Sequence, residues 1–257
     1  VVWNRTRAKA AALEAFGARV GETPAEAAVG ADRVHLCLSE DAAVDGALAE
    51  AGLVAGATVI DHSTCAPDGV AGRAARLAET GIGFLHAPVF MSPQNARDAK
   101  GLIVASGDRA VFDRVQPALA AMTGSVLWLG DVPERAAATK LLGNAVGIGL
   151  VSVLAEVLMM ARAFDVPFEV LTALLEQFNP MVAAKGRLGR MAAGDFAPAS
   201  FTLAMARKDV GLMLGSGIDA PVFQAIEVLM EEAGAEGGDQ LDYAVIGRRV
   251  VLDRGRG

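Results

Sequence analysis

The sequence of 257 residues has few of the residues from which several classes of site are built. Only two cysteines occur, Cys37 and Cys65, so no disulfide framework is expected; both are predicted to act as small apolar side chains, Cys37 within a buried strand. No run of Lys or Arg occurs, and the formal net charge is −7. Because phosphate binding needs clustered cations, a nucleic-acid partner is not expected. We predict no metal site.

The sequence also shows no signal peptide and has only one long apolar stretch. This stretch, Leu141 to Ala161, carries Asn144 and Glu156, and these polar residues favour a buried helix over a membrane span. We therefore expect a soluble cytoplasmic protein without a membrane partner. Apolar residues make up 53% of the chain, which is enough for a sizeable core in one large domain or two modest ones.

The first half of the chain alternates short apolar runs with amphipathic stretches. Strands are predicted at residues 1–3, 18–20, 33–38, 58–61, 82–89, 102–105 and 126–129, and helices at 8–16, 41–51, 68–79 and 109–122. Strands and helices in this order predict a mostly parallel sheet that is covered on both faces.

The second half shows helical periodicity and no predicted strand from Pro133 onward. A long helix to about Ala163 is followed by helical segments near 167–178, 180–193, 203–215, 221–234 and 239–249. The predicted fold class is an α/β doubly wound sheet over residues 1–130, followed by an all-helical domain over residues 131–257.

The chain opens with a predicted strand and then Asn4, Arg5 and Thr6, none of which is acidic. In a dinucleotide-binding fold, an acidic residue at this point accepts the 2′-hydroxyl of NAD, whereas an Arg pairs with the 2′-phosphate of NADP. Arg5 can also stack on adenine. The stretch favours NADP, and the alternative is an ordinary solvated Arg in a surface loop.

Two further stretches follow predicted strands, whose ends point into the ligand crevice in open α/β sheets. In DHSTCAPDGV, residues 61–70, Ser63 and Thr64 offer hydroxyl groups there, while Pro67 and Asp68 fit an ordinary helix start. The second stretch is HAPVFMSPQNARDAKG, residues 86–101, which begins at His86. We expect His86 to be a packed residue rather than a catalytic one.

A fourth stretch, KLLGNAVGIGL at residues 140–150, places a lysine inside an apolar run. Lys140 and Asn144 are four residues apart, so they share one face of the predicted long helix. They lie just past the predicted domain boundary, where a cleft between domains is expected. The ordinary alternative is a solvated surface lysine.

Together these stretches resemble the β-hydroxyacid dehydrogenase family, which includes 3-hydroxyisobutyrate dehydrogenase, tartronate semialdehyde reductase and glyoxylate/succinic semialdehyde reductase. VVWNRTRAKA, DHSTCAP, HAPV, KLLGN and ARKDVGLML occur in the order of that family over essentially the whole chain. The resemblance implies a Rossmann-like domain and a helical domain of the 6-phosphogluconate dehydrogenase type. It also implies hydride transfer between NADP(H), preferred over NAD(H), and a small hydroxy acid, semialdehyde or other carbonyl compound.

The resemblance implies roles for individual residues as well. Lys140 matches the catalytic lysine, which gives a proton to the substrate oxygen or, in reverse, takes the hydroxyl proton. The positions matching substrate-binding residues are Phe90, Met91, Ser92, Asn144, Phe201 and Asp209, and those matching cofactor-binding residues are Asn4, Arg5, Thr6, Ser63, Thr64 and Lys208.

The substrate loop departs from its family. The usual A-P-V-S-G-G is replaced by Ala-Pro-Val followed by Phe90, Met91 and Ser92, so a bulkier or less acidic carbonyl compound is a rival substrate. An imine-reductase-like enzyme is a further alternative, although such enzymes usually lack the lysine that Lys140 represents. A non-catalytic dimeric helical protein with a decayed nucleotide-binding domain is the alternative from another class.

The start of the chain and its apolar helix support two further expectations. The sequence begins at the family's second strand, without the Gly-rich turn that contacts pyrophosphate, so we expect a truncated start and weak cofactor binding by the chain as given. The apolar face of Leu150–Met160, with Gly147 and Gly149 beside it, exceeds what one small helical domain needs to bury. It predicts a homodimer or homotetramer.

Overall fold

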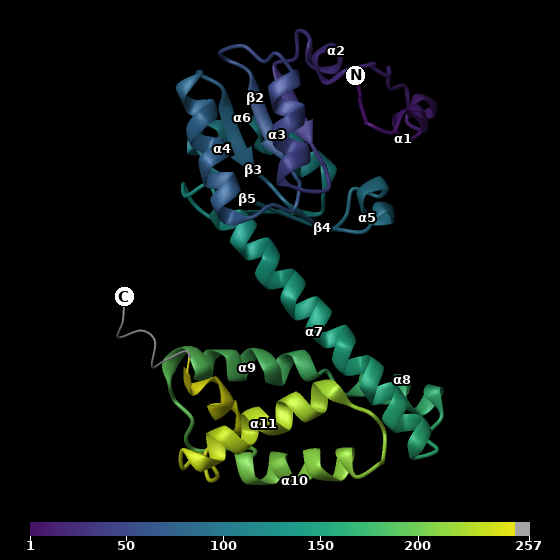
Figure 1. The fold of residues 1–257 in the computed structure, drawn as a ribbon, viewed down its shortest axis with the longest axis vertical. Coiled ribbons are helices and arrows are strands. Elements are labelled where there is room, and N and C mark those ends of the chain that lie inside the picture. The colour runs from purple at the N-terminus through teal and green to yellow at the C-terminus, as the bar shows by residue number, and fades with distance from the viewer. Residues whose placement is uncertain (250–257) are drawn as a thin grey trace. The chain divides into compact units, whose positions relative to one another are not determined.

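A computed structural model describes residues 1–249 of the chain. It divides into two compact units, Val1–Val146 and Gly147–Gly257, and one long helix, α7 (Arg135–Ala163), carries residues of both (Figure 1). The first unit contains the sheet, and the described part of the second is helical apart from one isolated bridge between Thr202 and Asp242. The predicted fold class, a Rossmann-like sheet followed by a helical region, is confirmed. The boundary after residue 130 stays a prediction.

The first unit is built on a six-stranded mixed sheet. The first three strands lie side by side and are parallel, the fifth pairs antiparallel with the third and the fourth, and the sixth pairs parallel with the fifth. The strands are β1 (Arg33–Leu36), β2 (Thr58–Asp61), β3 (Gly83–His86), β4 (Val89–Phe90), β5 (Leu102–Gly107) and β6 (Ser125–Trp128). The apolar run expected as one strand at 82–89 is thus two strands, separated by Ala87 and Pro88.

Helices cover both faces of this sheet. One face is covered by α3 (Asp41–Glu50) and α4 (Pro67–Glu79), and the other by α6 (Arg109–Met122). The shorter helices of this unit are α1 (Arg7–Ala11), η1 (Glu14–Phe16), α2 (Pro24–Ala28) and α5 (Pro93–Arg97). Successive side chains of a strand point to opposite faces. Val59 and Phe84 accordingly join a buried cluster with α3 and α4, whereas Ile60 and Leu85 join a second cluster with α6.

The N-terminal segment differs from the sequence prediction. The expected strands at 1–3 and 18–20 form only one isolated parallel bridge, between Val2 and Val20. Among residues 1–249, β1 pairs with β2 alone, and a cavity of about 630 Å³ lies between the N-terminal segment and β1. Because β1 is an edge strand here, Cys37 directly after it is exposed, and the expectation that it is buried was wrong; Cys65 is buried as expected.

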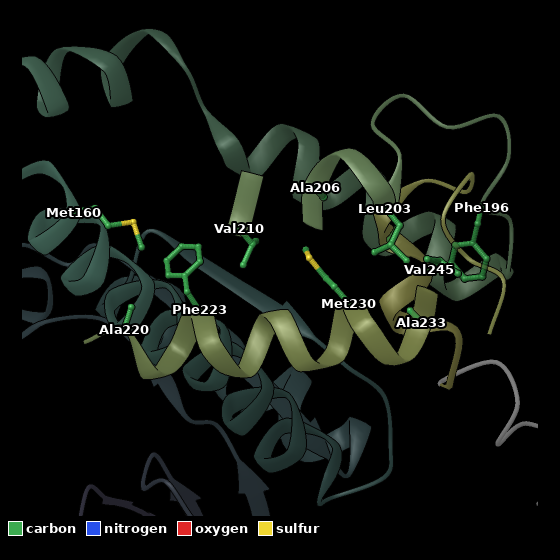
Figure 2. Close-up of a cluster of buried hydrophobic side chains, with 11 residues drawn as sticks. Met160, Phe196, Leu203, Ala206, Val210, Ala220, Phe223, Met230, Ala233 and Val245 are labelled. Atoms are coloured by element: carbon green, nitrogen blue, oxygen red, sulfur yellow. The ribbon is translucent and has the colours of Figure 1, made fainter. Parts of the chain in front are cut away.

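The second unit packs helices around one apolar cluster. Figure 2 shows Phe223 and Met230 of one helix pointing towards Val210 and Ala206 of another. After α7 the elements are α8 (Phe168–Gln177), α9 (Pro180–Ala193), α10 (Leu203–Leu214), α11 (Pro221–Ala235) and η2 (Tyr243–Gly247). The helix expected from residue 239 begins later, because the Asp242 side chain caps the 3-10 helix by accepting from Ala244 N at 3.1 Å.

Glu156 is a buried charged residue of this unit with a structural role. Its carboxylate accepts hydrogen bonds from the backbone N–H groups of Val222, at 2.7 Å, and Phe223, at 3.0 Å. These groups belong to the first turn of α11, where an anion satisfies free N–H donors and complements the helix dipole. The acidic residue inside the apolar stretch is therefore a helix cap.

The apolar stretch of α7 is not buried in the single chain, contrary to the sequence expectation. By length and composition alone, this helix could cross a membrane. Only 6% of its most apolar 18-residue stretch is buried within the described structure. Leu142, Ile148 and Val151 are all more than half exposed. The other described elements cover only a few of its side chains, such as Met160 and Ala161, which leaves a long apolar surface open.

Candidate functional site

The carboxyl ends of β1, β2 and β3 meet at one edge of the sheet, because these strands are parallel. Ser63 and Thr64 follow β2 there and differ in their surroundings. Ser63 is buried, its Oγ accepts a hydrogen bond from Leu38 N at 2.9 Å, and its own N donates to Asp61 Oδ1 at 2.9 Å. Thr64 is exposed. Of the two predicted cofactor contacts, Ser63 therefore ties together the ends of β1 and β2, and Thr64 is available to a ligand.

Asn4, Arg5 and Thr6 line one cavity of about 460 Å³, together with Cys37 and Leu38 after β1. Asn4 Oδ1 accepts a hydrogen bond from Thr6 N at 2.9 Å, which holds the turn before α1. The Arg5 side chain is exposed beside this cavity. The structure thus brings the three predicted ribose-side residues together at the carboxyl end of β1.

Lys140 and Asn144 lie on the first part of α7, whose start is anchored to the sheet. The buried hydroxyl of Ser106, in β5, donates to Pro133 O at 2.8 Å and accepts from Ala136 N at 2.8 Å. Lys140 follows about one turn later and is half-buried, and Asn144 is half-buried one turn beyond it. Burial lowers the pKa of the Lys140 ammonium from its ordinary value.

The loop after β3 reaches the same part of α7. Phe90, in β4, presents its ring to Lys140, with 4.2 Å between Lys140 Nζ and the ring centroid. Met91 follows and is half-buried. Ser92 is the N-cap of α5, where its Oγ accepts from Asn95 N at 3.1 Å and donates to Asn95 Oδ1 at 2.6 Å. Its hydroxyl is therefore engaged within the loop.

The remaining predicted residues belong to the second unit. The Phe201 ring contacts that of Tyr243 edge-on, with 5.7 Å between the ring centroids. Lys208 and Asp209 are adjacent on α10 and form an ion pair of 2.8 Å. Among the described residues, no group of three or more His, Cys, Asp or Glu side chains is arranged to hold a metal ion.

Sequence reasoning missed a buried network of charges beside the site. Arg73, on α4, is 1% exposed and contacts carboxylate oxygens of Asp41 and Asp45 at 3.0 Å and of Asp61 at 3.3 Å. Asp41 in turn accepts from Ala66 N at 2.9 Å. The signal was present in the sequence, because Arg73 interrupts the apolar face that runs from Val70 along α4.

A pair of histidines next to this network was also missed. His62 Nδ1 lies 2.7 Å from the carbonyl oxygen of Ala87, so it donates, and His62 Nε2 then accepts from His35 Nδ1 at 2.9 Å. Burial lowers the pKa of His62, and partial burial together with the neighbouring His62 lowers the pKa of His35 to about 4. His86 is fully buried, with Nδ1 3.5 Å from Asp61 Oδ2. These rings pack within the sheet edge.

Comparison with known proteins places the chain among dinucleotide-binding enzymes. Residues 1–130 match the family described as the NAD binding domain of 6-phosphogluconate dehydrogenase. An uncharacterized oxidoreductase of Shewanella frigidimarina is 29% identical over 98% of this chain and 90% of that protein. Glyoxylate/succinic semialdehyde reductase 2 of Arabidopsis thaliana is 27% identical over 95% of this chain and 71% of that protein.

The chain is also similar to a nuclear factor and to a reductive aminase of known structure. The human cytokine-like nuclear factor N-PAC is 30% identical over 94% of this chain, which spans 45% of that protein. The reductive aminase of Aspergillus terreus, solved with NADPH4, cyclohexanone and allyl amine, has a TM-score of 0.86 and 25% identity over 95% of this chain and 88% of that one. The chain therefore belongs to the family of the 6-phosphogluconate dehydrogenase NAD-binding domain, among the β-hydroxyacid dehydrogenase-like NAD(P)-dependent oxidoreductases.

Proposed function

We propose that the protein reduces a small carbonyl compound, or oxidises the matching alcohol, with NADP(H) as cofactor and Lys140 as the proton donor and acceptor. The observation that carries this proposal is that Lys140 is half-buried on α7, with its ammonium 4.2 Å from the ring centroid of Phe90, which follows β3.

The residues present fit the cofactor. The cavity beside β1 offers the Arg5 guanidinium and the Thr6 hydroxyl for the adenosine ribose and its 2′-phosphate, and Asn4 holds the turn that carries them. The exposed Thr64 hydroxyl would contact the nicotinamide side, with Lys208 as a further proposed cofactor contact. Bound NADPH supplies the hydride in reduction.

Lys140 would hold a proton at Nζ and donate it to the substrate oxygen as negative charge develops there; in oxidation the neutral amine would accept the hydroxyl proton. Burial lowers the pKa of Lys140, which makes the populations of the charged and neutral forms less unequal at neutral pH. The charged form is needed for reduction and the neutral form for oxidation. Asn144, one turn along α7, is proposed to bind the substrate, and Phe90, Met91, Phe201 and Asp209 are further proposed substrate-binding residues.

The test is a spectrophotometric assay of NADPH and NADH consumption with small aldehydes, ketones and imines, and of NADP⁺ and NAD⁺ reduction with hydroxy acids. Turnover of an aldehyde, a ketone or a hydroxy acid with NADP(H) preferred over NAD(H) supports the proposal, whereas turnover of imines alone would favour the imine-reductase-like alternative. The second candidate is a non-catalytic protein; one relative carries the name of a nuclear factor and not of an enzyme. Cofactor binding without turnover across the panel would support that candidate instead.

Arg5→Ala is expected to weaken NADPH binding about 10- to 100-fold more than NADH binding, since only NADPH carries the 2′-phosphate and one charge-assisted hydrogen bond to it is lost. Titration calorimetry with both cofactors measures the difference. Arg19→Ala, which removes an exposed cation of the same segment outside the cavity lining, is the matched control. Equal losses for both cofactors would show that Arg5 does not contact the 2′-phosphate.

We also propose that the protein is a homodimer or a dimer of dimers through α7. Gly147 and Gly149 allow close approach of a second helix, and the exposed side chains Ile148 and Val151 would be buried by it. We expect light scattering at micromolar concentration to give at least twice the mass of one chain. A monomer under these conditions would contradict the proposal.

A further inference from the structure

We propose that Phe90 is a positioning and specificity-determining residue: its ring, seated against Gly143, holds the Lys140 ammonium and makes the site select an uncharged carbonyl or imine compound over one that carries a carboxylate. The inference rests on the proposed function for its substrate class. The contact between Phe90 and Lys140 can be tested without any turnover.

The geometry of the contact is that of a cation–π interaction. Lys140 Nζ lies 4.2 Å from the centroid of the Phe90 ring, well inside the roughly 6 Å over which an ammonium is attracted to an aromatic face. The electron-rich face stabilises the charged form of a lysine that burial otherwise disfavours. It leaves the N–H donors of the ammonium that point away from the ring free for a substrate oxygen or nitrogen.

Gly143 makes room for the ring. It follows Lys140 by three residues and so shares its face of α7. A Cβ atom at Gly143 would lie 2.5 Å from both Cε1 and Cζ of Phe90, a distance at which the ring has to move. A glycine inside a helix is destabilising relative to alanine. At Gly143, the close approach of the Phe90 ring explains why a glycine stands inside the helix.

The backbone of Phe90 is held as firmly as its ring. Phe90 pairs with Leu102 across the antiparallel ladder between β4 and β5. Gly101, next to Leu102, has φ +101°, and a Cβ there would lie 2.8 Å from Met91 Cβ and 2.9 Å from Phe90 O. The ring is thus fixed from both ends, by the sheet below it and by the helix surface beside it.

This arrangement determines the substrate class. Phe90 and Met91 have no side-chain donor for a carboxylate, and the hydroxyl of Ser92 is taken up by Asn95. Within this loop a substrate carboxylate would meet an aromatic ring and a thioether, and the charged group it would pair with is the Lys140 ammonium over that ring. Pairing there would turn the N–H donors of the ammonium towards the carboxylate and away from the reacting oxygen or nitrogen, and it would favour the charged lysine over the neutral amine. An apolar group next to the reacting C=O or C=N bond fits the same space without this conflict.

The contact is tested by the pH dependence of Lys140 acylation, followed by mass spectrometry on the intact chain. Phe90→Leu keeps the apolar bulk and removes the ring. The pH at which Lys140 is acylated at half its maximal rate, its midpoint, should therefore fall by about 0.4–1.5 pH units, the equivalent of one lost cation–π contact. Lys208, measured in the same samples, is the internal control and should not change. An unchanged Lys140 midpoint would overturn the positioning role.

Gly143→Ala provides a second variant that leaves Phe90 in place. Its methyl group displaces the ring and should shift the Lys140 midpoint as well. In the Phe90→Leu background there is no ring to displace, so the same substitution should add no further shift. Additive shifts in the double variant would mean that Gly143 and Phe90 act on Lys140 independently, against the proposal.

The substrate class is tested with paired four-carbon aldehydes, one carrying a terminal carboxylate and one without it. The wild-type protein should favour the uncharged aldehyde at least about tenfold in kcat/KM, and Phe90→Ser should reduce that preference. A preference for the carboxylate would overturn the substrate class and leave the Lys140 contact standing. No turnover with any substrate, despite the midpoint shift, would reject the proposed function and the substrate class with it.

Discussion

Replacing Lys140 with Ala is expected to lower the turnover number of the protein about 10²- to 10⁴-fold, the range for loss of a general acid. Reduction of a carbonyl group makes an oxyanion that needs one proton. Lys140, half-buried on α7 against the ring of Phe90, is the group proposed to supply it. The affinity for NADPH should change little, because Lys140 is assigned to the substrate and not to the cofactor. Steady-state kinetics and calorimetric titration separate the two effects.

Two further variants show whether the loss belongs to this lysine. Lys185→Ala removes an exposed lysine of α9 that has no proposed role, so its turnover should stay within about twofold of wild type. His86→Ala tests the other titratable candidate of the loop, which is fully buried behind the sheet edge. Near-normal turnover of Lys140→Ala combined with an inactive, folded His86→Ala would overturn the assignment of Lys140.

The sequence predicted the regular elements well because their signals are local. Strands such as Thr58–Asp61 and helices such as Arg109–Met122 coincide with their predicted ranges, since an apolar run or an amphipathic period needs no information from elsewhere in the chain. The strand predicted at the N-terminus does not form as a regular element. Val1 to Trp3 have the composition of a strand, but a strand also needs a neighbour, and the segment makes only the bridge to Val20.

The candidate site was predictable as a set of residues and not as a set of contacts. Lys140 and Phe90 both emerged from the motifs, yet the 4.2 Å approach between them depends on how β4 is placed against α7. The same holds for Arg73, whose three carboxylate partners come from α3 and β2. Such contacts join residues tens of positions apart, and no local pattern encodes them.

Arg73→Met is expected to destabilise the first unit by about 3–5 kcal/mol, the range for removing one partner of a buried ion pair. The substitution keeps the apolar stem and leaves the buried Asp61 carboxylate without its cation. Both tryptophans, Trp3 and Trp128, belong to the first unit, so urea unfolding followed by tryptophan fluorescence reports on this unit. The second unit serves as the unaffected part of the molecule.

Arg76→Met is the matched control for this substitution. Arg76 lies on the same helix and contacts the same carboxylate, with Nη2 2.8 Å from Asp45 Oδ1, but its side chain is 61% exposed. Exposed pairs contribute about 0–1 kcal/mol, so this variant should unfold nearly as the wild type does. Equal effects of the two substitutions would mean that burial of Arg73 adds nothing to the stability of the unit.

The loop that carries Thr64 should loosen together with this network. Asp61 accepts from Ser63 N at 2.9 Å and Asp41 accepts from Ala66 N at 2.9 Å, so Arg73 holds both ends of residues 63–66 through the two carboxylates. We therefore expect Arg73→Met to weaken cofactor binding as well as folding. The buried ion network would then serve the site by fixing the loop at the end of β2.

The effect of Arg73→Met should depend on pH with a defined sign. Burial alone raises the pKa of Asp61, but the contacts with His86 and Ser63 outweigh it, and the pKa lies below its ordinary value. A carboxylate whose pKa is lowered on folding adds stability above its unfolded pKa of about 3.9 and loses it as the pH falls through the folded value. In the variant, protonation of Asp61 removes a buried charge that no longer has Arg73 as a partner. The difference in unfolding free energy between wild type and Arg73→Met should therefore be largest near pH 7 and shrink below about pH 4. A difference that stays constant down to acid pH would show that it comes from lost packing and not from charge.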